Sequence, residues 1–214
     1  MPVIAVAHSK GGCGKTTTCY NLICCMLPSL AIDWDIHGGI SVLNSIRSED
    51  GPLHIVNPQN IPEMLKLVQE YDEKGELVII DCGGFDSDAT RAAVAIADLV
   101  LVPASDTITE RIGLSIFDAT LEKVSQDIGR DIQAKLVICK THPAKKNFPK
   151  LDAVLEQTKH VSRLKSVISN RPDHHECHEF GLGVTERLAT RHTAAGKEIL
   201  ALVEEINELL AEAA

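Results

Sequence analysis

Residues 10–17 combine three glycines with two lysines and two threonines. They read Lys10-Gly11-Gly12-Cys13-Gly14-Lys15-Thr16-Thr17. Glycines let backbone N–H groups close around phosphate oxygens, and the first turn of a following helix adds partial positive charge. In such a loop Lys15 reaches the terminal phosphates and the Thr16 hydroxyl ligates Mg²⁺. The sequence therefore predicts a site for a nucleoside triphosphate. The alternative, a glycine-rich turn without a ligand, leaves the acidic motifs downstream unexplained.

The loop departs from the common pattern G-x-x-x-x-G-K-[ST] at its first position. That pattern requires glycine at position 9, where this chain has Ser9. A second lysine, Lys10, stands five residues before Lys15. This form, KGGxGKT, is the deviant phosphate loop, and it is far more selective than a lone G-x-G-x-x-G.

Two aspartates, Asp33 and Asp35, follow the apolar run 29–32. If strand geometry persists, residues two apart project on the same side of the chain. Facing the phosphate loop, they would organise Mg²⁺ and its waters and place a water for attack on a phosphate. The alternative is a pair of solvated turn aspartates.

Asp81 ends the clearest buried strand of the chain, the run 77–80. A continuous apolar run followed by an acid is typical of the strand whose carboxylate holds a Mg²⁺-bound water beside Thr16. The glycines that follow allow the backbone to approach a terminal phosphate and to move after hydrolysis. The alternative role for Asp81 is to cap the helix that begins near Ser87.

Strands and helices are expected to alternate along the whole chain. The expected strands are 2–8, 29–33, 53–56, 77–81, 99–103, 134–139 and 166–169. The expected helices are 15–27, 41–47, 61–71, 90–97, 107–128, 150–158 and 194 to the C-terminus. This order predicts a single α/β domain over residues 1–214, with a doubly wound, mostly parallel sheet and helices on both faces. The apolar face of helix 107–128 is expected at Ile112, Ile116, Ala119 and Val124.

Composition favours a cytoplasmic protein without a membrane segment. The seven cysteines form no C-x-x-C pair and are odd in number, which favours reduced thiols. No apolar run approaches the roughly 20 residues that span a bilayer. The first residues already read as a strand, so no signal peptide is expected.

The net charge of −9 is unevenly placed. Residues 132–197 carry 12 Lys and Arg against 6 Asp and Glu. A basic third in an acidic chain predicts one face that binds a polyanion, the alternative being ordinary surface scatter. The candidate contacts are Lys140, Lys145, Lys146, Lys150, Lys159, Arg163, Lys165, Arg187 and Arg191.

A histidine-rich run at 174–178, His-His-Glu-Cys-His, has the composition of a metal cluster. Its spacing matches no recognised zinc pattern, and no second half is present nearby. We therefore expect a solvated surface segment rather than a metal site.

The order KGGxGKTT, D-x-D, apolar-Asp-Gly-Gly and apolar-Pro resembles the ParA/MinD family of deviant Walker-A P-loop ATPases over most of the chain. The nearest type is the small, ParF-like ParA ATPase that partitions DNA. Because the loop lies at residue 10, no room is left for the N-terminal helix-turn-helix domain of larger relatives. The resemblance implies that Asp35 orients the hydrolytic water; Ile36-His37 stands where partition proteins usually have Pro-Gln.

The resemblance also implies ATP, ADP and Mg²⁺ as cofactors and an ATPase cycle that is slow without a partner. Two subunits would clasp two ATP molecules, with Lys10 of each reaching the phosphates of the other. The ATP-bound homodimer would bind DNA non-specifically, as a nucleoid-associated protein, until a centromere-binding, ParB-like partner stimulates hydrolysis. Relatives contact the base after the strands 134–139 and 166–169, which points to Lys140, Arg171 and Pro172.

Two other functions remain open. One is a MinD-like membrane-positioning ATPase, although that class ends in a basic amphipathic helix and residues 198–212 of this chain carry five glutamates and no Lys or Arg. The other is a nucleotide-switch accessory factor in conjugative DNA transfer with negligible turnover. It remains an alternative because Ile36-His37 departs from the Pro-Gln of partition proteins.

Overall fold

A computed structural model of the chain describes residues 2–47, 51–84 and 87–212. Its sheet has seven strands in the order β3-β2-β4-β1-β5-β6-β7, and every described pair is parallel. The strands are β1 (Val3–Val6), β2 (Leu30–Trp34), β3 (Ile55–Val56), β4 (Val78–Cys82), β5 (Leu99–Ala104), β6 (Ala134–Thr141) and β7 (Val161–Ser169). The predicted fold class is confirmed.

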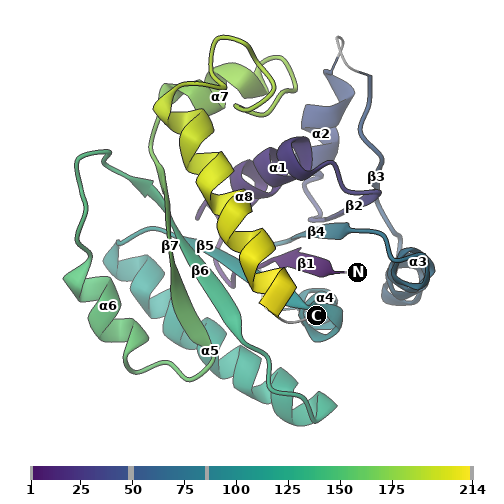
Figure 1. Cartoon of the computed structure of the whole chain (residues 1–214). Helices are drawn as coiled ribbons and strands as arrows, with labels where there is room; N and C mark the ends of the chain where they lie inside the picture. Colours follow the sequence, from purple (N-terminus) through teal and green to yellow (C-terminus); the bar gives the residue numbers. More distant parts are fainter. Residues whose placement is uncertain (1, 48–50, 85–86, 213–214) are drawn as a thin grey trace.

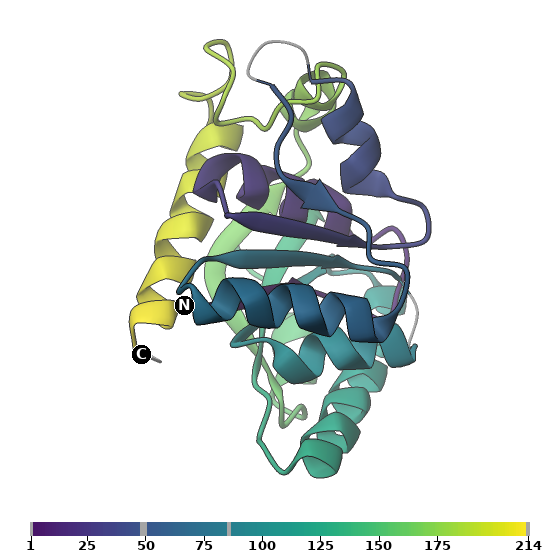
Figure 2. The ribbon, with the colours of Figure 1, turned by 90° about the vertical axis from the view of Figure 1, so that its right-hand side faces the viewer.

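Helices cover both faces of the sheet (Figure 1, Figure 2). The helices are α1 (Lys15–Met26), α2 (Gly39–Ser45), α3 (Ile61–Glu73), α4 (Asp88–Ile96), α5 (Ile108–Ile128), α6 (Pro149–Leu155), α7 (Pro172–His178) and α8 (Ala194–Glu212). Apolar side chains of α1, α2, α7 and α8 form the core on one face, and those of α3 to α6 form the core on the other. The predicted order of elements is confirmed, with α7 as an additional short helix.

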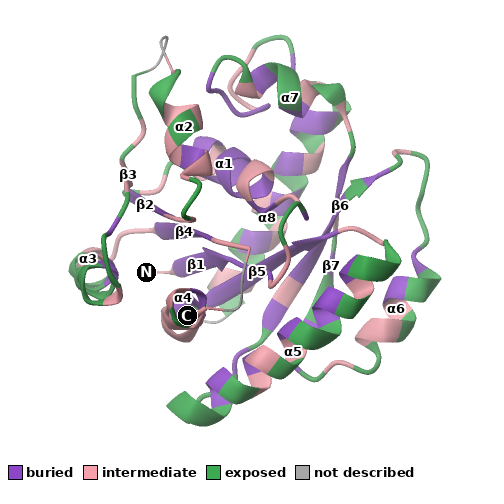
Figure 3. Ribbon diagram, turned by 180° about the vertical axis from the view of Figure 1, so that it is seen from behind, coloured by how far each residue is buried: buried purple, intermediate pink, exposed green. Residues whose placement is uncertain are grey.

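Strand β1 shows why the central strands are apolar throughout. Ile4 and Val6 point into the α1/α8 core, whereas Val3 and Ala5 point into the α3–α6 core. Successive side chains of a strand face opposite sides, so a strand covered on both faces must be apolar at every position. The strands are accordingly buried along most of the sheet (Figure 3).

The apolar face expected for the long helix α5 is wrong at three of its four positions. Ile112 and Ile116 are 56% and 55% exposed, and Ala119 is also exposed. The helix instead buries Leu114, Phe117, Leu121 and Val124. Both rows recur at helical spacing, so the pattern alone could not decide between them, and the packing on the sheet selected the row with the aromatic ring.

The segment 174–178 is not the solvated stretch that we expected. It forms most of α7, in which His174 and Cys177 are buried. The chain after α7 packs on α1, where Tyr20 Oη donates to the Gly181 carbonyl at 2.7 Å. The Val184 N–H also donates to Asn21 Oδ1 at 2.9 Å. Buried partners on α1 therefore hold this segment in place.

None of the helices in the described ranges is both long enough and apolar enough to cross a bilayer. On α8, Ile199, Leu202 and Ile206 are buried against the sheet. The carboxylates on this helix bind the neighbouring strand instead, as when Glu205 accepts the N–H groups of Lys165 and Ser166 at 2.8 and 2.9 Å. The apolar stripe of α8 thus belongs to the domain core.

Candidate functional site

The phosphate loop and the acidic motifs meet at one edge of the sheet. Strands β1 and β2 flank β4, and both Val6 and Asp33 lie in register with Asp81. Because parallel strands all end at the same edge, the loop after β1 lies beside both aspartates. The structure therefore brings together residues that stand up to 70 positions apart.

Glycines give the loop its curvature. Gly12 has φ 77° and Gly14 has φ 107°, a region that side-chain-bearing residues rarely adopt. Gly14 immediately precedes α1, and its carbonyl accepts the N–H of Thr18. The free N–H groups of the first turn of α1 consequently point into the loop, which is the arrangement that binds an anion.

Lys15 is buried where the loop meets the chain after β4. Its ammonium donates to the Lys10 carbonyl at 2.7 Å. A Cβ added to Gly84 would lie 3.2 Å from this same ammonium, so only glycine fits there without a shift. Lys15 therefore lies between the loop and the Gly83-Gly84 segment.

Asp81 is fully buried, and neither of its carboxylate oxygens has a hydrogen-bond partner in the described structure. Burial, followed by the charge of Asp33, raises the pKa of Asp81 to about 8, while Lys15 and the Thr16 hydroxyl act in the opposite direction. A buried carboxylate with two unpartnered oxygens, next to a second buried carboxylate, supplies the oxygen donors that a hard divalent cation prefers. These residues fit Mg²⁺.

Asp33, near the end of β2, and Asp35, just beyond it, form different contacts. Asp33 Oδ2 accepts the N–H of Ser41 at 2.8 Å, which ties the end of β2 to α2. Asp35 lies beyond the end of the strand and accepts the N–H of His37 at 2.9 Å. A Cβ on Gly83 would lie 3.8 Å from Asp35 Cγ, so this carboxylate faces the segment after β4. Strand geometry stops at Trp34, and for this reason Asp35 is positioned by a turn.

The described residues contain no cluster of side chains that could coordinate a metal ion directly. Within those ranges no three His, Cys, Asp or Glu side chains converge to hold an ion. A Mg²⁺ ion here would therefore take the Thr16 hydroxyl directly and the aspartates through water.

The three residues expected near the base do not act alike. Lys140 has φ 54°, and its ammonium donates to the Gly12 carbonyl at 2.7 Å, so it contacts the phosphate loop itself. The Arg171 guanidinium binds Glu198 of α8 at 2.8 Å, and Pro172 begins α7. Lys140 lies near the end of β6 and Arg171 just after β7, and because these neighbouring strands are parallel both residues lie at the same sheet edge as the loop.

Sequence reasoning missed two buried polar residues next to the loop, His8 and Glu110. Thr107 and Glu110 form the T-x-x-E pattern of a capping box, and Thr107 Oγ1 does accept the Glu110 N–H. A complete capping box would place the Glu110 carboxylate at the backbone N–H of Thr107, at the start of α5. In the structure the carboxylate lies near Lys10 and His8 instead.

The basic residues of 132–197 do not gather at one edge. Lys145 follows β6 and pairs with Asp106 at 2.6 Å, whereas Lys159 precedes β7 and pairs with Glu122 at 2.9 Å. In parallel strands these two positions lie at opposite edges of the sheet. Arg163 also has a carboxylate partner, Asp152. A polyanion would have to compete with these pairs.

Comparison with known proteins agrees with the motifs. No protein-family model matches the chain. The ParA protein of Rhizobium radiobacter is 32% identical over 109 residues, which cover 48% of each chain, so the match spans about half of that protein's length.

Solved structures share the fold over nearly the whole chain. The MinD cell division protein of Aquifex aeolicus superimposes with a TM-score of 0.71 at 17% identity, covering 97% of this chain and 98% of that one. A plasmid partition protein of Borrelia burgdorferi bound to AMPPNP gives 0.67 at 18% identity, with the same coverage. The Cyanothece McdA–ATP complex gives 0.66 at 15% identity, covering 97% and 96%. These structures show that the chain has the fold of MinD and of the plasmid partition protein, and the partial match to a ParA protein agrees with the lysine-bearing phosphate loop.

Proposed function

We propose that this chain is an ATPase that binds Mg²⁺-ATP at the carboxyl edge of its sheet. The observation that carries the proposal is the meeting of Lys15 and Thr16 with the unpartnered carboxylate of Asp81. A site with two lysines, free helix N–H groups and buried acids suits a ligand that carries its own cation. The related structures with AMPPNP and ATP support this choice of nucleotide.

Each residue has a distinct part in the proposed reaction. Lys15 binds the terminal phosphates once it leaves the Lys10 carbonyl. Thr16 and Asp81 would hold Mg²⁺, and the bound ion would supply positive charge beside the phosphates. Asp35 places the attacking water, since its carboxylate faces Gly83 after β4. Lys10 completes the site of a second subunit in an ATP-bound homodimer.

The biological role that we propose is DNA partition. The matched relative is a ParA protein, and the basic third offers lysines and arginines for sequence-independent phosphate contacts. The ATP-bound dimer would associate with the nucleoid, and a centromere-binding, ParB-like protein would accelerate hydrolysis. DNA co-sedimentation at several salt concentrations, with and without ATP, tests this role. DNA binding of equal strength with and without ATP would refute it.

The buried stripe of α8 argues against the membrane-positioning alternative. A helix whose apolar side is occupied by the core and whose other side is acidic has nothing to insert into an anionic bilayer. Pelleting with anionic liposomes and ATP, run beside pelleting with DNA, separates the two roles. Binding to liposomes alone would reverse the assignment.

Phosphate release separates an ATPase from a nucleotide switch without turnover. We expect slow release from the chain alone and faster release with DNA and the partner. Background release under all conditions, together with tight ATP binding, would favour the accessory factor in conjugative DNA transfer.

A further inference from the structure

Glu110, in the first turn of α5, is a buried carboxylate that faces the start of the phosphate loop. Its oxygens lie 3.8 Å from Lys10 Nζ and 3.7 Å from His8 Nε2, and Oε2 has no hydrogen-bond partner within the described chain. Burial raises the pKa of Glu110, and Lys10 is the strongest influence in the opposite direction. A buried carboxylate without hydrogen bonds is costly, so the nearby ammonium must compensate for it.

His8 does not supply that compensating charge. Its Nδ1 accepts the Lys10 N–H at 3.1 Å, which leaves the imidazole proton on Nε2, facing Glu110. Burial lowers the pKa of His8 to about 4, so the ring is neutral at physiological pH. The charge interaction at this point is therefore between Glu110 and Lys10.

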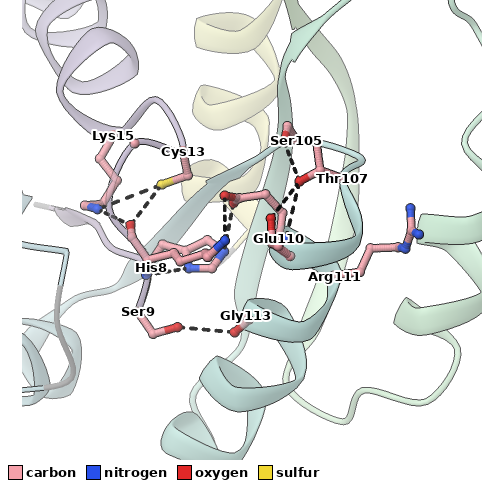
Figure 4. A network of polar contacts seen from close by, with 12 residues as sticks. His8, Ser9, Cys13, Lys15, Ser105, Thr107, Glu110, Arg111 and Gly113 are labelled. Atoms are coloured by element: carbon pink, nitrogen blue, oxygen red, sulfur yellow. Dashed lines mark hydrogen bonds and ion pairs between the residues drawn. The ribbon is translucent and has the colours of Figure 1, made fainter.

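The surrounding contacts fix the geometry of this pair. Ser9 Oγ donates to the Gly113 carbonyl at 3.2 Å, and a Cβ on Gly113 would lie 3.1 Å from His8 Cε1. The beginning of the loop is thus pressed against the first two turns of α5. In Figure 4 the Glu110 side chain extends toward His8, while Arg111 points away from it.

We propose that Glu110 is a positioning residue that holds the Lys10 ammonium on its own chain until nucleotide displaces it. The inference rests on the proposed function, because it concerns the lysine of the same phosphate loop. Bound phosphates would place several negative charges near Glu110, and one ammonium cannot satisfy both anions. Glu110 thereby weakens nucleotide binding. It also keeps Lys10 on its own chain until nucleotide binds, so that Lys10 is not free to reach a second subunit before then.

The contact itself is tested on the nucleotide-free protein with a zero-length carbodiimide, which joins an adjacent amine and carboxylate as an amide with loss of water. Mass spectrometry should find a Lys10–Glu110 cross-link in monomeric chains. Mg²⁺-ATP should reduce its yield several-fold. Failure to find the cross-link without nucleotide, or an unchanged yield with it, would overturn the proposal.

The functional consequence is tested by titration with a fluorescent N-methylanthraniloyl ATP analogue and Mg²⁺. Glu110→Gln should lower the Kd about tenfold, within the usual range of coupling between sites. Asp106→Asn is the matched control, because it removes a negative charge from the same end of α5 where Asp106 pairs with Arg111 and Lys145. The control should change the Kd less than twofold.

A double-mutant cycle identifies the partner. In a Lys10→Ala background, Glu110→Gln should act no more strongly than the Asp106→Asn control. The proposal is contradicted if Glu110→Gln still has a tenfold effect in the absence of Lys10. It is also contradicted if Asp106→Asn changes the Kd as much as Glu110→Gln does, or if Glu110→Gln binds the analogue more weakly than the wild type. Glu110→Asp, which shortens the side chain by one methylene, should also lower the Kd. This variant replaces Glu110→Gln in the test if the glutamine variant does not fold.

The two tests keep the inference separate from the proposed function. A wild-type chain that binds no ATP analogue refutes the ATPase proposal, and the cross-link without nucleotide still decides whether Glu110 holds Lys10. A wild-type chain that binds ATP while Glu110→Gln leaves the Kd unchanged refutes the role of Glu110 alone.

Discussion

Asp33 of β2 and Asp81 of β4 lie in register across neighbouring parallel strands, and both are buried. Asp33 uses its carboxylate to hold α2 through Ser41, whereas Asp81 has no partner of its own. A divalent cation would relieve the mutual repulsion of two such groups. We therefore expect this pair to account for the Mg²⁺ dependence of nucleotide binding.

Asp81→Asn should therefore remove most of the Mg²⁺ dependence of nucleotide binding. In the wild type, we expect chelation of Mg²⁺ to weaken ATP binding at least tenfold, because the metal joins Asp81 and Thr16 to the phosphates. Calorimetric titration with ATP, in Mg²⁺ and in EDTA, measures both values. An asparagine variant that keeps the full Mg²⁺ dependence would show that Asp81 does not hold the ion.

Lys15→Ala should abolish ATP-dependent dimerisation. The ammonium of Lys15 is buried beside the loop, and its loss removes the charge that the proposed function places at the terminal phosphates. Sedimentation velocity with and without Mg²⁺-ATP measures the change. Lys146→Ala, an exposed lysine beyond β6, is the control and should dimerise as the wild type does. Normal dimerisation of the Lys15 variant would remove the loop from the mechanism.

Asp35→Ala should bind ATP and dimerise but hydrolyse it at least a hundredfold more slowly. The carboxylate of Asp35 faces Gly83 and is not part of the buried pair, so its loss spares binding and affects only the placement of water. Phosphate release under single-turnover conditions measures hydrolysis apart from binding. Wild-type turnover in this variant would assign the water to another residue.

Arg47→Ala should destabilise the fold by about 3–5 kcal/mol, the usual cost of leaving one buried charge without its partner. The Arg47 side chain is 2% exposed and binds both oxygens of Glu186 at 2.9 and 3.0 Å. It thereby joins the end of α2 to the segment that covers α1. Urea unfolding measures the loss, and Lys74→Ala, which breaks the exposed pair with Glu70, should cost less than about 1 kcal/mol.

The free energy of unfolding should fall as the pH drops from about 6.5 to about 4, in part because of His178. Burial lowers the pKa of His178 to about 4, so the unfolded chain binds a proton in this range that the folded chain does not. His178→Gln should reduce this acid sensitivity by about 1–3 kcal/mol, after allowance for partial solvent screening. Urea titrations at several pH values measure it. His192→Gln, at an exposed position, should leave the pH dependence unchanged.

Local patterns predicted the elements well, because each depends on neighbours in the chain. The run before Asp81 is apolar at every position, and only a strand covered on both faces explains this. The deviant loop, with Lys10 and Lys15 five residues apart, likewise predicted a nucleotide site from neighbouring residues alone. The long helix α5 shows the limit, since two apolar rows competed and only contact with the sheet chose between them.

The sequence by itself predicted which residues would bind phosphate and which acids could hold Mg²⁺, and it determined that a parallel sheet carries them. Only the tertiary structure decided how they meet. It set Asp33 opposite Asp81, turned Asp35 away from the strand, and brought Glu110 to Lys10 across a separation of 100 residues. The spacing of residues in the sequence predicts which side chains share a face only within a single helix or strand. Contacts between distant segments depend on strand order and on which face of each helix is buried, and these follow from packing the whole chain.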